Sequence, residues 1–145
     1  MTLIYEMLAQ LEANHCRITK RMRAVLQAAV DHRQECLTAR EIHAYAEKCL
    51  PGISIATVYR IISSFCKAGI LRTLQTGTRV SHYELISGER YADHPCCICR
   101  KCGQIIGIFD LRMRELLSEC VRVIGDSGGF QIDSLQVIGY GLCET

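Results

Sequence analysis

Two cysteines separated by two residues and followed by a glycine, Cys99, Cys102 and Gly103, constrain this chain more than any other short stretch of its sequence. Thiolates at this spacing can bind one tetrahedral metal ion, and the glycine lets the backbone turn around the sulfur atoms. A redox-active pair of the same spacing usually opens a helix after a strand, whereas a β-type run follows here. The motif therefore predicts a metal site, with Cys143, at the end of the last expected strand, as the third ligand.

The fourth ligand of this site is not evident from the sequence. A water molecule can complete the shell, or one of three further cysteines, Cys96, Cys97 and Cys120. The chain has ten cysteines in all and no signal segment or membrane-length apolar run at its start. We therefore expect a cytoplasmic protein with reduced thiols. Because the sequence contains neither a catalytic triad nor a phosphate-binding loop, we do not expect an enzyme.

The first half of the chain has helical periodicity in three segments. Residues 20–32 form one apolar stripe. A second helix begins at Thr38, which forms a capping box with Glu41, since each side chain can satisfy a free backbone N–H of the other. A third stripe runs from Ser54, a favourable N-cap, to Gly69. Two helices joined by a short turn that contains glycine predict a helix-turn-helix.

The remaining pattern predicts a hairpin and then a second domain. Residues 70–75 and 79–86 flank a three-residue loop, which makes the first domain a winged helix-turn-helix over residues 1–82. Residues 83–145 are expected to form a small α+β dimerisation domain, with strands at 105–109 and 130–138. Between these strands we expect a helix that begins at Asp110 and turns the following apolar residues inward: Met113, Leu116, Leu117, Cys120, Val121 and Ile124.

The outward face of the third helix suits the major groove of DNA. It carries Thr57, Tyr59 and Arg60, and an arginine can donate two hydrogen bonds to guanine while methyl groups and aromatic rings meet thymine. The net charge of +2 gives no general argument for nucleic-acid binding. Basic residues are nevertheless concentrated in the first half of the chain, beginning with Arg17, Lys20, Arg21 and Arg23.

A second set of metal-binding side chains lies close to the expected domain junction. It contains His82, Glu84, His94 and Cys96, which are all competent ligands for a divalent ion. An ion bound there would fix the angle between the two domains.

Several of these motifs together resemble the ferric uptake regulator family. The resemblance rests on Ile55-Ala-Thr-Val-Tyr-Arg60, Tyr83-Glu-Leu85, the CxxCG motif and Tyr140-Gly-Leu-Cys143. It implies a metal-loaded homodimer that represses transcription by binding double-stranded DNA at a palindromic operator. It also implies that Tyr59 and Arg60 contact bases and that Arg17 lies near the minor groove.

The resemblance also assigns two metal sites. Cys99, Cys102 and Cys143 occupy three of the four positions of a structural zinc site, and the fourth position falls beyond Thr145. The sensing site of the family resembles the set Cys36, Glu84, His94 and Cys96.

Two positions of this sensing set that are commonly histidine are cysteine here, and thiolates favour zinc over Fe(II) or Mn(II). We therefore expect a zinc-responsive repressor of metal-uptake genes. The alternatives are an iron-responsive regulator or a peroxide or haem sensor of the same family. The alternative of another class is a zinc-bound interaction module, or a thiol redox protein, that does not bind DNA.

Overall fold

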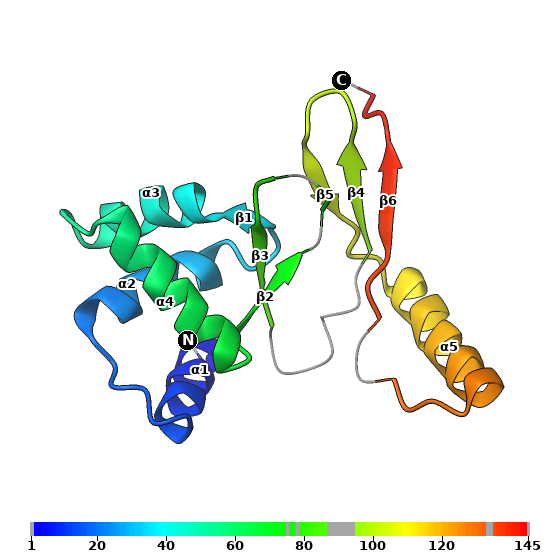
Figure 1. The fold of residues 1–145 in the computed structure, drawn as a ribbon, viewed down its shortest axis with the longest axis horizontal. Helices are drawn as coiled ribbons and strands as arrows, with labels where there is room; N and C mark the ends of the chain where they lie inside the picture. The colour runs from blue at the N-terminus through cyan, green and yellow to red at the C-terminus, as the bar shows by residue number, and fades with distance from the viewer. Residues whose placement is uncertain (1, 75, 78, 87–94, 133–134, 145) are drawn as a thin grey trace. The chain divides into compact units, whose positions relative to one another are not determined.

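The computed structural model describes residues 2–74, 76–77, 79–86, 95–132 and 135–144. They form an α+β protein of two compact units, Met1–Ser87 and Gly88–Thr145 (Figure 1). The sequence predicts the division after residue 82, and the contacts within the structure divide the chain at Ser87. Residues 83–86 belong to the first unit, because the strand β3 (His82–Leu85) pairs with two other strands of that unit.

The first unit is a winged helix-turn-helix, as the sequence predicts. Its sheet has the strand order β1-β3-β2, and both pairings are antiparallel. The short strand β1 was not expected; it joins the sheet because Leu37 and Thr38 pair with Tyr83 and His82. The elements that precede β3 are α1 (Thr2–Ala13), α2 (Lys20–Asp31), β1 (Leu37–Thr38), α3 (Ala39–Cys49), α4 (Ile55–Lys67) and β2 (Leu71–Leu74).

The caps predicted from the sequence are formed. The N–H of Glu41 donates to Thr38 Oγ1 at 3.2 Å, and the N–H of Thr38 donates to Glu41 Oε2 at 2.7 Å. At α4 the N–H of Thr57 donates to Ser54 Oγ at 3.2 Å. These bonds satisfy backbone groups that a helix start leaves without partners, and so they determine where α3 and α4 begin.

The apolar stripes of the helices pack into one core in the first unit. The largest fully buried side chains include Leu26, Ile42, Ile62, Phe65 and Ile70. Burying a side chain of this size contributes roughly 1.5–3 kcal/mol. Because one face of α4 is held in this core, its other face is presented outward.

The second unit contains three strands and one helix. These are β4 (Cys96–Cys99), β5 (Ile105–Gly107), α5 (Leu111–Gly128) and β6 (Ile138–Gly141). The strand order is β5-β4-β6, with β5 antiparallel and β6 parallel to β4.

The prediction of a strand over residues 130–138 is wrong, since the last strand begins only at Ile138. The described residues between α5 and β6, 130–132 and 135–137, are irregular and return the chain from α5 to the start of β6.

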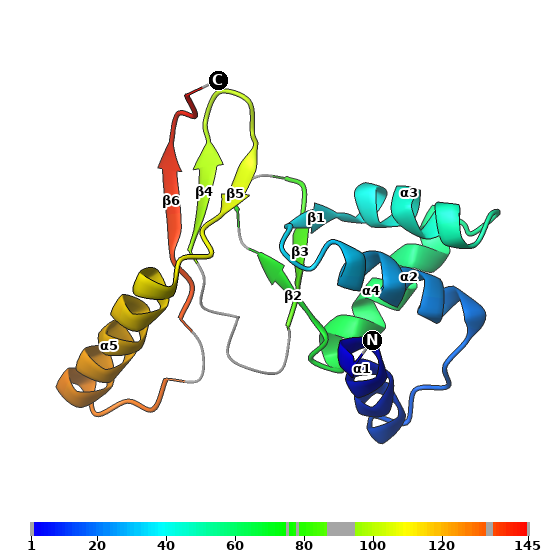
Figure 2. The same cartoon turned by 180° about the vertical axis from the view of Figure 1, so that it is seen from behind.

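Helix α5 exposes most of its apolar side chains in this single chain. Its N-cap is Asp110, whose carboxylate accepts the N–H of Arg112 at 2.8 Å, and it ends at Gly129, which has a φ of 61°. Of its residues only Leu117 is buried, whereas Leu116 is 54% exposed and Ile124 is 46% exposed. Figures 1 and 2 show that α5 leaves one end of the sheet and extends away from it.

The expectation that the whole apolar stripe of α5 turns inward is therefore wrong within one chain.

Every helix in the described parts of the chain is too short or too polar to span a bilayer.

Candidate metal centre and DNA-binding surface

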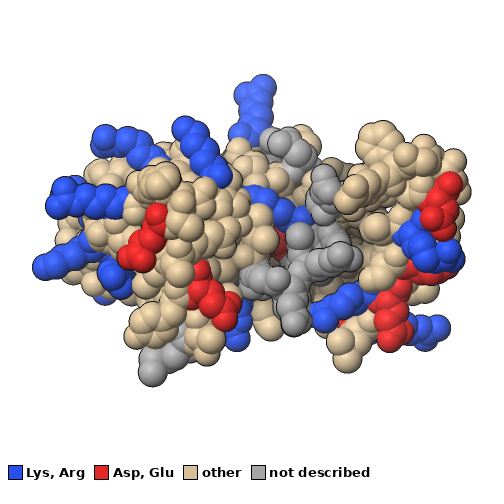
Figure 3. All heavy atoms as spheres, turned by 90° about the horizontal axis from the view of Figure 1, so that it is seen from below, with Lys and Arg blue, Asp and Glu red and all other residues tan. Residues whose placement is uncertain are grey.

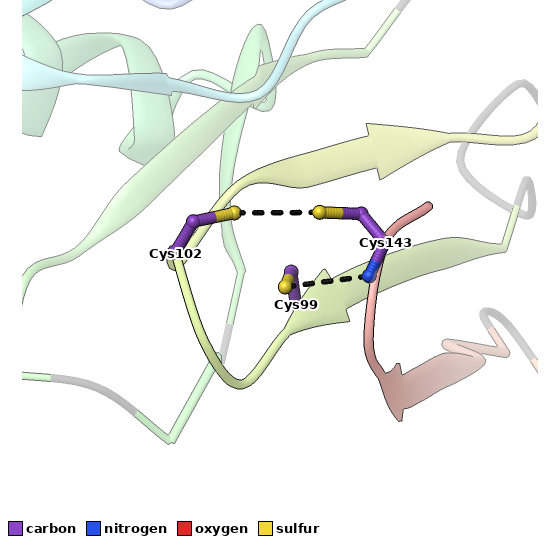
Figure 4. A group of neighbouring side chains, drawn as sticks. All are labelled: Cys99, Cys102 and Cys143. Atoms are coloured by element: carbon purple, nitrogen blue, oxygen red, sulfur yellow. Dashed lines mark hydrogen bonds between the residues drawn. The ribbon is translucent and has the colours of Figure 1, made fainter. Parts of the chain in front are cut away.

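Three cysteine sulfurs come together at one end of the sheet in the second unit (Figure 4). Cys99 ends β4, Cys102 lies in the turn that follows, and Cys143 comes shortly after β6. Their Sγ atoms all lie within 4.8 Å of one another, and those of Cys102 and Cys143 are 3.7 Å apart. We call these residues the three-thiol group. It is the set that the sequence predicts as metal ligands.

The backbone around the turn holds the three-thiol group in place. The N–H of Gly103 donates to the carbonyl of Cys99 at 2.9 Å, and Gly103 has a φ of +74°, in the left-handed region that favours glycine. The N–H of Arg100 donates to the carbonyl of Gly141 at 2.8 Å. This bond ties the end of β6 to the turn, so two segments distant in sequence present their thiols at one point.

Hydrogen bonds favour the thiolate form of Cys99. The backbone N–H of Cys143, 3.4 Å from Cys99 Sγ, acts with those of Cys102 and Lys101 to lower the pKa of Cys99 from 9.0 to about 6. At Cys102 the backbone N–H of Gln104 lowers the pKa, but the neighbouring thiols of Cys99 and Cys143 raise it further, so that it lies above 9.0. Cys99 is therefore ionised before Cys102 as the pH rises.

The donors and their spacing fit a zinc ion. Zinc binds thiolate sulfur at about 2.3 Å in tetrahedral geometry, which places two ligating sulfurs about 3.8 Å apart. The 3.7 Å between Cys102 and Cys143 matches this value, whereas a disulfide brings two sulfurs to about 2.05 Å. All ten cysteines are free thiols. The three-thiol group can therefore supply three of the four ligands of a tetrahedral zinc site.

The cysteines considered for the fourth position lie outside this group. Cys96 is buried on the opposite face of β4 from Cys99, because alternate residues of a strand face opposite sides. Cys97 shares the face of Cys99 but is exposed, and Cys120 is exposed on α5. Among the described residues, no other histidine, cysteine or acidic side chain joins the three thiols.

The expected sensing residues are distributed over both units. Cys36 and Glu84 belong to the first unit, and Cys96 belongs to the second. His94 lies outside the described residues. The assignment of these four residues to one site stays a prediction.

Glu84 has a partner that the sequence analysis did not anticipate. It is 3% exposed on β3, and its Oε2 accepts hydrogen bonds from Arg72 Nε and Nη2, both at 2.7 Å. The two residues are direct neighbours across the antiparallel β2–β3 pair. Their adjacency follows from the hairpin register, so that register was the signal from which this ion pair could have been predicted.

The residues expected to contact DNA lie on and near the outward face of α4. Arg60 is exposed and Tyr59 is 51% exposed. Thr57 is half-buried, and its hydroxyl lies 2.8 Å from Ser54 Oγ, so it takes part in capping α4. Arg17 is exposed in the segment before α2.

A hollow of about 250 Å³ adjoins Arg60 and brings in a further basic residue. Its wall includes Thr57, Arg60 and Ser64 of α4 together with Thr19 and Arg21 at the start of α2. Arg21 was not among the expected contacts, although the basic run that begins at Arg17 was the signal for it. Lys and Arg side chains project at several places from the first unit in Figure 3.

Comparison with known proteins identifies one family. A model of the ferric uptake regulator family matches residues 4–138. Transcriptional regulator FurA of Mycobacterium tuberculosis is 30% identical over 143 residues, which cover 99% of this chain and 91% of that protein. The peroxide operon regulator of Bacillus subtilis is 27% identical, with 96% of this chain and 90% of that protein covered.

Solved structures share the fold at lower sequence identity. The ferric uptake regulator of Helicobacter pylori has a TM-score of 0.73 at 21% identity, covering 99% of this chain and 90% of that one. That of Vibrio cholerae has a TM-score of 0.71 at 22% identity, covering 92% and 96%.

Fold and site together define a metal-responsive transcription regulator with a winged-helix DNA-binding domain. The chain belongs to the ferric uptake regulator family, whose members are dimeric DNA-binding regulators and not enzymes.

Proposed function

We propose that this protein is a zinc-responsive repressor that acts in the cytoplasm as a homodimer on a palindromic operator. The observation that carries the proposal is the three-thiol group, whose soft donors and tetrahedral spacing suit zinc. A structural zinc ion held by Cys99, Cys102 and Cys143 links the end of β4 to the segment after β6. Metal-binding free energy there adds to the stability of a small domain.

In this proposal α4 enters the major groove. Tyr59 and Arg60 contact base edges, Thr57 lies beside them, and Arg17 reaches the minor groove. The exposure of Tyr59 and Arg60 supports this arrangement, because neither side chain is used by the core of the first unit. A symmetric dimer then reads two half-sites separated by about one helical turn, or 10–10.5 bp.

A second, exchangeable ion at Cys36, Glu84, His94 and Cys96 selects the domain angle that binds DNA. Two thiolates in this set favour Zn(II) over Fe(II) or Mn(II). The rival within the family is an iron- or peroxide-responsive regulator, which the names of the Neisseria and Bacillus relatives indicate for those proteins.

The ion pair between Arg72 and Glu84 raises the affinity that the second ion needs in order to bind Glu84. Because the guanidinium already contacts Glu84 Oε2, a cation must displace it or share the carboxylate with it. A ligand shifts an equilibrium only by the difference in its affinity for the two states, so this competition lowers the response to weakly binding ions.

A metal titration tests the proposal. Chelator-treated protein is titrated with Zn(II), Mn(II) or Fe(II) without oxygen, and operator binding is followed by fluorescence anisotropy. We expect Zn(II) to give the largest gain in operator affinity, and to do so at the lowest free metal concentration. A tenfold gain corresponds to about 1.4 kcal/mol, and operator DNA should tighten zinc binding by the same factor.

Three variants separate the two metal sites. Cys99→Ser should release the structural zinc and disrupt the dimer. Cys96→Ser should keep that zinc and the dimer but lose the zinc-dependent gain. Cys49→Ser, an exposed thiol at the end of α3 outside the three-thiol group, is the matched control and should behave as wild type. A response to Fe(II) alone would overturn the zinc assignment, and wild-type protein that binds no palindromic DNA with any ion would contradict the regulator itself.

A further inference from the structure

The first unit has a second hollow, which is larger than the one beside Arg60. Its lining includes two arginines that are not among the DNA-contacting residues proposed above. It measures about 510 Å³ and lies where the start of α3, the middle of α4 and the segment that leads into β3 meet. Its lining residues are Thr38, Ala39, Arg40, Tyr59, Arg79, Val80, Ser81 and Tyr83. The lining has two guanidinium groups and two phenol rings, and it has no acidic side chain.

This hollow lies on the flank of α4 away from Arg60. A helix turns about 100° per residue, so Tyr59 points about 200° around α4 from Thr57. Thr57 and Arg60 line the hollow of about 250 Å³ together with Arg21, whereas Tyr59 lines the hollow of about 510 Å³. The exposed face of α4 therefore has an arginine-lined hollow on each side.

The donors of the larger hollow suit a phosphodiester. A guanidinium binds phosphate oxygens through two parallel N–H bonds, and a tyrosine hydroxyl can donate a further one. Arg40 and Arg79 are both exposed, so their donors are accessible to a ligand as large as DNA.

The start of α3 is not itself the anion site. The Glu41 carboxylate already accepts the N–H of Thr38 at 2.7 Å and its hydroxyl at 2.9 Å, and this negative charge would repel a phosphate. The two arginine side chains must therefore supply the attraction.

We propose that Arg40 and Arg79 hold a backbone phosphate of the operator in this hollow, next to the base pair that Tyr59 contacts. They are positioning residues, since a phosphate contact sets the register of the protein on the duplex and carries no base identity. The inference rests on the proposed function, because it presupposes that α4 lies in the major groove.

The dependence of binding on salt concentration tests this inference. The slope of log K against log salt changes by about 0.9 for each phosphate contact with B-DNA. The two arginines share one phosphate in each protomer and a dimer holds two such phosphates, so the double variant Arg40→Ala/Arg79→Ala should reduce the slope by about 1.8 and each single variant by part of that amount. Both variants should weaken binding to the operator and to unrelated duplex DNA by the same factor, whereas Arg40→Lys, which keeps the charge, should keep most of the slope.

Arg33→Ala is the matched control. Arg33 is exposed in the same unit and lines neither hollow, so its removal lowers the charge equally and should leave the slope unchanged. Thermal unfolding of each variant verifies that the first unit is intact.

Two results would overturn the inference. Both alanine variants could keep the wild-type slope, or their loss of affinity could be confined to the operator, which would make them base contacts. Failure of the proposed function is distinct, because the wild type would then bind no operator at all.

Discussion

The lowered pKa of Cys99 makes the stability of the zinc-free protein depend on pH. The thiol titrates at about 6 when folded and at its ordinary value of 9.0 when unfolded. Between these values the unfolded chain binds a proton that the folded chain does not, so stability rises with pH. The contribution is fully present above about pH 9 and is lost as the pH falls toward 6.

Denaturant unfolding of zinc-free protein at several pH values measures this contribution. Cys99→Ser should show a flatter pH dependence than wild type across the window. Cys97→Ser, on the same strand and face, should keep the wild-type dependence. Equal curves for Cys99→Ser and wild type would show that the backbone N–H groups do not stabilise the thiolate.

Replacing Arg60 tests a base contact, in contrast to the phosphate contacts assigned to Arg40 and Arg79. We expect Arg60→Ala to weaken specific binding by about 1–3 kcal/mol per bidentate contact, with the loss concentrated at one base pair of each half-site. Binding of operators with single base-pair changes is the measurement. A uniform loss across unrelated sequences would instead make Arg60 a phosphate contact.

At the scale of elements, the helices were predictable and the strands only partly so. The apolar stripes and the caps at Thr38, Ser54 and Asp110 define helices locally, and all three caps are formed. The strand β1 has only two residues, and its pairing with Tyr83 and His82 is a long-range contact that no local pattern reveals. The apolar residues over 130–138 were mistaken for a strand, whereas the described residues 130–132 and 135–137 are irregular and only Ile138 begins β6.

The glycine at position 139 determines how closely β6 approaches β4. Gly139 is paired with Cys97, and an added Cβ would lie 3.3 Å from Cys97 Sγ. Gly139→Ala should therefore destabilise the zinc-loaded protein, within the range of about 1–3 kcal/mol for overpacking. In a Cys97→Ala background the same change should cost less, which a double-mutant cycle reports as coupling of about 0.5 kcal/mol or more.

Gly141→Ala is the control for this cycle. An added Cβ at Gly141, on the same strand, meets no atom within 4 Å. Its effect on unfolding should be small and independent of Cys97. If Gly139→Ala costs the same with and without the Cys97 sulfur, the close approach is not what limits position 139.

At the scale of the whole molecule, the exposed stripe of α5 is best explained by a second copy of the chain. Helical periodicity identifies an apolar face but not what covers it. Leu116 and Ile124 are about half exposed on a helix that extends from the sheet. A contiguous apolar surface of this kind usually marks a protein interface.

Leu116→Asp should therefore shift the zinc-loaded protein from dimer to monomer and reduce operator affinity. Sedimentation velocity at several protein concentrations measures the shift. Ser118→Asp places the same charge at an exposed position about 200° around the helix and should leave the dimer unchanged. A dimer of unchanged affinity in Leu116→Asp would exclude this face of α5 as the interface.

The two proposed metal sites differ in how far the sequence could predict them. The three-thiol group lies within one unit, and the CxxCG turn with a terminal strand was sufficient to find it. The fourth ligand has no sequence signal. The proposed sensing residues come from distant parts of the sequence, and no local pattern predicts whether they come together.

The parallel pairing of β6 with β4 also determines when the three-thiol group is completed during folding. The hairpin β4–β5 forms from neighbouring residues, whereas Cys143 is 41 positions from Cys102 and must wait for a slow, non-local pairing. A growing chain first displays a two-thiol half-site and gains the third sulfur only when its last strand docks. In the proposed function, tight retention of zinc therefore marks the completion of the second unit, and we expect a chain interrupted before β6 to lose its metal readily.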